Sequence, residues 1–130
     1  MIRHKELTVY LEEILQAANY IDSYTKNMTY EQLLDDPKTT QAVILNLLII
    51  GENSNKLLTQ HPSFTQDNKD MRWGAMRGMR NRIAHSYFEI NMEVVWDTIQ
   101  TSIPEIIERL SSIKNKIIEN KPPPEPELER

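Results

Sequence analysis

Apolar residues recur at steps of three and four along most of this chain, the spacing that places them on one face of an α-helix. The pattern is clearest near the two ends. In the C-terminal part its members are Met92, Val95, Trp96, Ile99, Ile103, Ile106, Leu110, Ile113 and Ile117. In the N-terminal part they are Leu7, Leu11, Ile14, Leu15, Ala18 and Ile21. Two such seams predict an all-α protein, an antiparallel bundle of four to five helices.

The most apolar part of the chain is TTQAVILNLLIIGENSNKLL, residues 39–58. Its central apolar run is also compatible with a buried strand. The helical pattern continues for about 20 residues, however, which is too long for a strand. We therefore predict a helix that is buried on most of its sides. Such a helix lies either in the centre of the bundle or beneath a second subunit.

Proline and glycine divide the middle of the chain. A short helix is predicted over residues 29–34, and the proline of DDPKTT then interrupts the pattern. Residues 59–70, TQHPSFTQDNKD, are predicted to form a polar loop. The next helix should carry residues 71–85, where Gly74 and Gly78 lie four apart and permit another helix to approach closely.

The last helix is predicted to begin near Asn91 and to kink at Pro104. Beyond it, KPPPEPELER contains too much proline and too few apolar residues to continue the helix or to pack. We predict one helical domain over residues 1–120 and a flexible Pro/Glu-rich tail over residues 121–130.

The composition excludes several classes of function. No cysteine occurs, which removes disulfides, thiolate metal sites and cysteine nucleophiles. His4, His61 and His85 lack metal-ligand spacing, and no phosphate-binding glycine loop occurs, so we expect neither a metal nor a cofactor. The N-terminus lacks a signal-peptide core, and the apolar run Ala42–Ile50 is far shorter than the roughly 20 residues that span a bilayer. These features predict a cytoplasmic protein with no membrane partner.

A basic cluster contrasts with the overall charge of -4. Four arginines lie within eleven residues and precede His85: Arg72, Arg77, Arg80 and Arg82. One explanation is a solvated helix face, or a set of salt bridges to acids such as Glu52, Asp67 or Glu89. Glu52 lies in the apolar segment and is therefore a candidate partner for a buried arginine. On this view Tyr87 and Phe88 are core or interface aromatics.

The other explanation is a site that cleaves phosphodiesters. An imidazole transfers protons near neutral pH, and a guanidinium binds a phosphate and stabilises charge on its oxygens. Because RNA carries its own nucleophile, the 2′-hydroxyl, one histidine and one arginine suffice in principle without a metal. Arg80 lies five residues before His85, about 140° around a helix. The two side chains therefore do not automatically point at one spot. They could converge if the helix ends near His85, or if a second copy of the chain supplies the arginine.

Three segments together resemble the HepT-like proteins of the HEPN superfamily: IGEN (50–53), WGAMRGMRNRIAHSYFEI (73–90) and VWDTIQTSIPEI (95–106). The most specific feature is an Arg-X4-His-X-Tyr motif, here Arg80, His85 and Tyr87, with the polar Asn81 after the arginine. The resemblance implies a HEPN-like homodimer whose two motifs face a shared cleft. It implies a metal-independent endoribonuclease in which Arg80 and His85 cleave RNA and Asn81 supports them. From their charge, Arg72, Arg77 and Arg82 are expected to extend the RNA phosphate-binding surface.

The resemblance also implies a partner. In HepT/MntA toxin–antitoxin pairs, the toxin cleaves cellular RNA (mRNA or tRNA), and an MntA-like nucleotidyltransferase neutralises it by transferring AMP to the motif tyrosine, here Tyr87. The added phosphates would compete with RNA for the arginines. Two alternatives stay open. In the first, the chain is a non-catalytic helical partner or substrate-recruiting subunit of a two-component minimal nucleotidyltransferase. In the second, it is a purely structural helical dimer.

Overall fold

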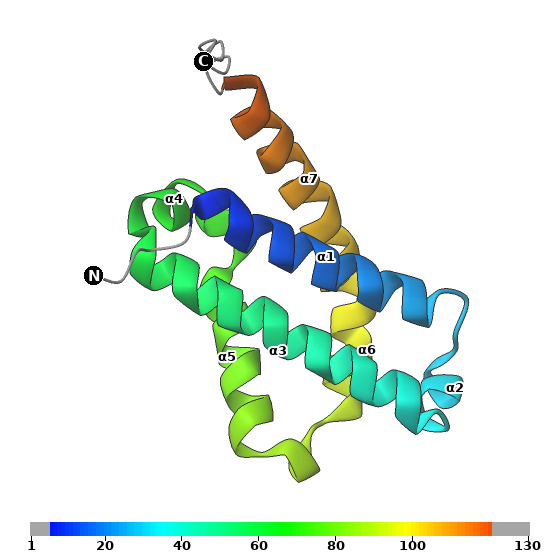
Figure 1. The fold of residues 1–130 in the computed structure, drawn as a ribbon. Helices are drawn as coiled ribbons and strands as arrows, with labels where there is room; N and C mark the ends of the chain where they lie inside the picture. The colour runs from blue at the N-terminus through cyan, green and yellow to red at the C-terminus, as the bar shows by residue number, and fades with distance from the viewer. Residues whose placement is uncertain (1–5, 121–130) are drawn as a thin grey trace, which may run out of the picture.

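Four helices of more than ten residues build the fold, in a computed structural model that describes residues 6–120. They are α1 (Leu7–Thr25), α3 (Pro37–Gln60), α5 (Trp73–His85) and α7 (Ile103–Asn120). The antiparallel α1 and α3 lie side by side, α5 packs against α3, and α7 packs against α1 (Figure 1). The described part of the chain contains no strand. The predicted all-α bundle is therefore confirmed.

The central helix is α3, which contacts both α1 and α5. It begins at Pro37, and the Asp36 carboxylate caps it by accepting hydrogen bonds from the backbone N–H and the hydroxyl of Thr39. Its three buried polar side chains donate to carbonyls four residues earlier in the same helix: Asn46 to Ala42, Asn53 to Ile49 and Ser54 to Ile50. The segment is therefore a helix, not the strand that its apolar run also allowed, and the helix's own carbonyls satisfy its buried polar side chains.

The short helix α2 (Tyr30–Leu34) confirms the prediction for residues 29–34. The Thr29 hydroxyl accepts from the Gln32 backbone N–H, and the Gln32 side chain accepts from the Thr29 backbone N–H. This reciprocal capping box fixes the first turn of a helix that is too short to be stable alone.

The C-terminal seam is also confirmed, and its interruption has a clear cause. After the Asn91 cap come α6 (Met92–Asp97), the π-helical turn η3 (Thr98–Ser102) and α7. Pro104 has no N–H and its ring would clash with the carbonyl of Gln100, which lies inside η3. The widened turn therefore accommodates the proline and lets the seam continue into α7.

The prediction of a polar loop over residues 59–70 is wrong. That stretch contains the end of α3, the helix α4 (Pro62–Asp67) and the 3₁₀ turn η1 (Lys69–Met71). Pro62 starts α4, since its fixed backbone angle suits the first helical turn. Phe64 then packs its ring 5.9 Å from that of Trp73, and Thr65 is buried. The contact of Phe64 with Trp73 therefore anchors this stretch to the rest of the fold, despite its polar composition.

No helix within residues 6–120 has both the length and the apolar character needed to cross a bilayer. The predicted tail, residues 121–130, lies outside the described residues, and so does His4.

Candidate active site

The basic cluster lies on α5, which the core holds at both ends. Trp73 and Ile83 are buried, and the Trp73 indole N–H donates to the Asn68 carbonyl at 3.0 Å. The helix stays regular through His85, and the Ser86 N–H closes its last turn on the Arg82 carbonyl at 2.9 Å. The arginines and the histidine are therefore displayed on a fixed helix.

Gly51 on α3 sets the distance between α3 and α5. A Cβ atom built on Gly51 would lie 2.2 Å from Arg80 Cβ and 2.7 Å from the Met76 carbonyl oxygen. Both distances are far below contact, so only glycine lets the helices meet here. The apolar pattern of the sequence does not predict this role. The only sign of it is one glycine inside the otherwise apolar centre of a long helix.

Gly74 and Gly78 would permit a close helix approach, but no described element of the same chain makes one at either glycine. A Cβ on Gly74 would meet no atom within 4 Å among the described residues. A Cβ on Gly78 would meet only the Arg82 side chain, at an ordinary 3.6 Å. Both glycines face away from the α3 contact, because α5 turns its Met76 and Arg80 side toward Gly51.

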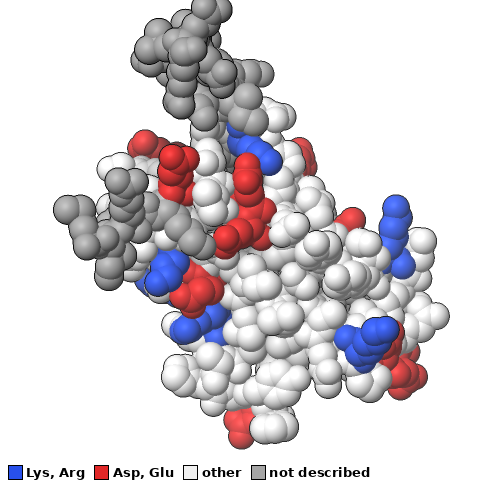
Figure 2. Space-filling model, viewed as in Figure 1, with Lys and Arg blue, Asp and Glu red and all other residues white. Residues whose placement is uncertain are grey.

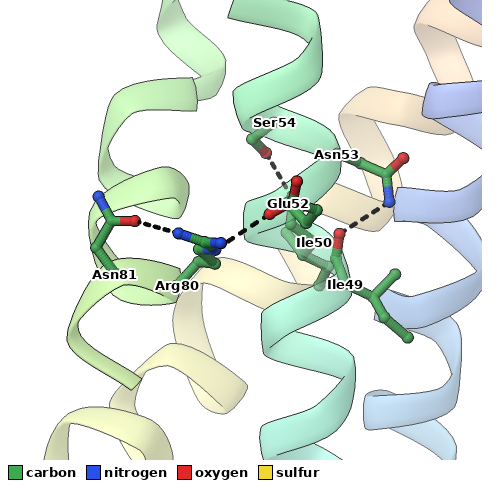
Figure 3. A network of polar contacts seen from close by, with 7 residues as sticks. All are labelled: Ile49, Ile50, Glu52, Asn53, Ser54, Arg80 and Asn81. Carbon is green, nitrogen blue, oxygen red and sulfur yellow. Dashed lines mark hydrogen bonds and ion pairs between the residues drawn. The ribbon is translucent and has the colours of Figure 1, made fainter. Parts of the chain in front are cut away.

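Arg80 is held in place by neighbours on two helices (Figure 3). Its Nε lies 3.1 Å from the Glu52 carboxylate on α3, and its Nη1 donates to the Asn81 side-chain oxygen at 2.8 Å. The side chains of Arg80 and Glu52 remain 37% and 44% exposed. The structure thus brings Glu52 to an arginine that is half-exposed instead of buried. The guanidinium keeps N–H donors that no described residue uses.

The other three arginines of the basic cluster have no acidic partner among residues 6–120. Arg72, Arg77 and Arg82 are exposed, and neither Asp67 nor Glu89 pairs with any of them. Arg72 adopts a left-handed backbone, φ 56°, at the turn into α5. Of the four arginines in the cluster, only Arg80 therefore fits the explanation by salt bridges. On the side of the molecule that Figure 2 shows, the Lys and Arg side chains are scattered and form no broad basic patch.

His85 is exposed, and no hydrogen bond or ion pair links it to another described residue. Since α5 ends at His85 itself, this residue stays on the helical path. Arg80 and His85 are then separated by about 140° around the helix and about 7.5 Å along it. One chain does not bring them together.

Tyr87 and Phe88 follow in the 3₁₀ turn η2 (Tyr87–Glu89). They are 45% and 98% exposed, and their rings meet edge to face at 5.4 Å. Within one chain they are therefore not core aromatics. No group of three or more metal-ligating side chains occurs in the described part of the chain.

Known proteins match most of this sequence. The family described as ribonuclease HepT-like matches residues 14–113. A Thermococcus cleftensis protein named "Probable ribonuclease HepT" is 35% identical over 103 residues, or 79% of this chain and 88% of that protein. A Caldanaerobacter subterraneus protein named "Putative RNase" is 33% identical over 107 residues, or 82% and 93% respectively. No solved structure matches. The chain belongs to the HepT-like ribonuclease family.

Proposed function

We propose that this protein is a metal-independent endoribonuclease and the toxin of a toxin–antitoxin pair. One observation carries the proposal, in a chain of the HepT-like ribonuclease family. Helix α5 displays Arg80, which Glu52 and Asn81 hold in place, and the exposed His85, which has no hydrogen-bond partner among residues 6–120. Relatives named as ribonucleases support RNA as the substrate.

The reaction needs one proton to be removed and one to be supplied. An imidazole of His85 takes the proton of the 2′-hydroxyl, and the 2′-oxygen attacks the adjacent phosphorus. The bond to the 5′-oxygen breaks, and that oxygen receives a proton from the second His85 of a dimer or from water. Arg80 binds the phosphoryl oxygens as charge builds on them. The products are a 2′,3′-cyclic phosphate and a 5′-hydroxyl end.

The separation of Arg80 from His85 supports a homodimer. If two copies bring the C-terminal ends of α5 together, Arg80 of one copy can face His85 of the other across a shared cleft. Asn81 holds the Arg80 guanidinium from within the same helix, at 2.8 Å. Arg72, Arg77 and Arg82, which have no acidic partner in the described part of the chain, would attract the RNA backbone toward that cleft.

The exposure of Tyr87 supports control by modification. Tyr87 is 45% exposed, and its hydroxyl has no hydrogen-bond partner among the described residues. An MntA-like nucleotidyltransferase could therefore reach the hydroxyl oxygen and transfer AMP to it. The transferred phosphate would pair with nearby guanidinium groups and compete with RNA.

The test uses the purified full chain and a labelled single-stranded RNA. Cleavage should persist in excess EDTA, yield a cyclic phosphate, and disappear in Arg80→Ala and in His85→Ala. His61→Ala serves as the matched control, because it removes a histidine at the end of α3 instead of α5. Light scattering should show a dimer for all variants. Full activity of His85→Ala would overturn the mechanism.

The exposed Tyr87 also fits the alternative of a recruiting subunit without catalysis. In that case the purified chain would cleave no RNA, while co-expression with the nucleotidyltransferase would still add AMP to Tyr87. Intact-mass measurement and cleavage of the same samples separate the two functions.

A further inference from the structure

A cavity of about 330 Å³ lies between the C-terminal half of α5, the segment after it, and α6. Its apolar lining includes the buried Ile83 and Val95 and the half-exposed Val94. This volume falls within the range of small-molecule sites. A flat, largely apolar group of the size of a nucleobase fits such a space.

Two opposite charges line the cavity without neutralising each other. Arg82 and Glu89 are both among the residues that line it. Neither forms an ion pair with any described residue. A matching ligand therefore has an anionic group for Arg82, a hydrogen-bond donor for Glu89, and a flat apolar body between them.

We propose that this cavity binds one nucleotide of the RNA and selects a base that bears an amino group. The inference rests on the proposed ribonuclease function. The nucleotide phosphate pairs with Arg82, and the Glu89 carboxylate accepts a hydrogen bond from the exocyclic amino group. Uracil is disfavoured, because it presents a carbonyl oxygen where cytosine presents its amino group.

The position of the cavity supports a role in substrate binding. Ser86 lines it and lies between His85 and Tyr87 in the chain. A nucleotide bound here is therefore next to the residues proposed to act on RNA. The ring of Phe88, 98% exposed, offers a stacking surface for a neighbouring base. An apolar protein segment fits less well, since it would bury Arg82 and Glu89 without partners.

The test is titration of the full chain with CMP and with UMP, two ligands of nearly equal size that differ in the amino group. Amide chemical shifts should change around Val94 and Val95, and CMP should bind roughly ten-fold more tightly than UMP. Glu89→Gln should bring the two affinities close together. Val94→Trp should fill the cavity and abolish binding. Val9→Trp, the same change at a comparably exposed valine on α1, should leave binding unchanged.

Equal affinities for CMP and UMP in the wild type would overturn the proposal, as would CMP binding that survives Val94→Trp. Loss of a dimer in Val94→Trp, seen by light scattering, would also overturn it, because the cavity would then be a contact between copies. The titration does not depend on cleavage. Selective CMP binding without any RNA cleavage would sink only the ribonuclease function, whereas cleavage without binding of either mononucleotide would sink only the cavity assignment.

Discussion

Replacing Gly51 by alanine is expected to destabilise the protein, because α5 leaves no room for the added methyl group. The new Cβ would lie 2.2 Å from Arg80 Cβ, while ordinary contacts begin at 3.4 Å, so the atoms must separate by 1.2 Å (3.4 − 2.2). The second obstacle, the Met76 carbonyl oxygen at 2.7 Å, belongs to the backbone. No side-chain rotation relieves either clash, and α5 itself has to move.

The cost follows from two opposing effects. Overfilling a packed contact costs about 1–3 kcal/mol. Alanine in a helix interior is favoured over glycine by about 0.5–1 kcal/mol, which offsets part of that cost. We expect a net loss of about 1–2 kcal/mol in the free energy of unfolding. The displaced α5 should also carry Arg80 away from Glu52 and reduce RNA cleavage.

Urea denaturation followed by circular dichroism measures this loss, and Gly74→Ala is the matched control. A Cβ on Gly74 meets nothing within 4 Å, so the same substitution on α5 should gain about 0.5–1 kcal/mol. The two variants should therefore shift the midpoint in opposite directions. If Gly51→Ala is as stable as the wild type, the close contact of α3 with α5 is not what fixes Arg80. A destabilised Gly74→Ala would instead indicate a second copy packed against that face.

Three further predictions concern charge. Glu52→Gln should lower the cleavage rate by loosening Arg80, yet change the free energy of unfolding by less than about 1 kcal/mol, because the pair is half-exposed; an unchanged rate would contradict it. The hydrogen bonds from Thr39 lower the pKa of the Asp36 carboxyl. The stability that Asp36 contributes is therefore complete above the ordinary aspartate pKa and fades as the pH falls below it. The thermal unfolding temperature of Asp36→Ala should converge on that of the wild type only at acidic pH. The third variant is Arg77→Gln in a His85→Ala background. It should reduce the steepness of the plot of log affinity for single-stranded RNA against log salt concentration by about 0.7, measured by fluorescence anisotropy. An unchanged slope would exclude a phosphate contact of Arg77.

The helices could be predicted from the sequence because their apolar faces repeat with the helical period, as α1, α3 and the seam from Met92 onward show. The 59–70 stretch could not, since Pro62 can either break a helix or begin one, and only the contact of Phe64 with Trp73 decides between them. The same limit applies to Gly51. A glycine in a helix permits a close approach without requiring one, as Gly74 and Gly78 show. Only the fold tells that α5 approaches at Gly51.

The spacing of Arg80 and His85 left open whether the two side chains converge within one chain. A regular helix from Arg80 to His85 keeps the two side chains on different faces, and α5 is regular over that whole stretch. The Glu52 pairing could only be suggested, because it depends on the register of α3 against α5. That register follows from the contact at Gly51, one residue before the carboxylate.

The charges on α5 divide into two kinds, and the proposed reaction would use them differently. Arg80 is paired with Glu52, so the two together add little net charge to the surface, and their contact orders the guanidinium before substrate arrives. Arg72, Arg77 and Arg82 have no acidic partner among the described residues, and their attraction for phosphates is long-ranged and screened by salt. Capture of RNA should therefore weaken with ionic strength, whereas the chemical step on bound RNA should depend on it much less. In this way an acidic protein would bind a polyanion. The net charge of the chain matters less than a few cations that have no acidic partner among residues 6–120 and lie beside Arg80, the arginine proposed to bind the phosphate.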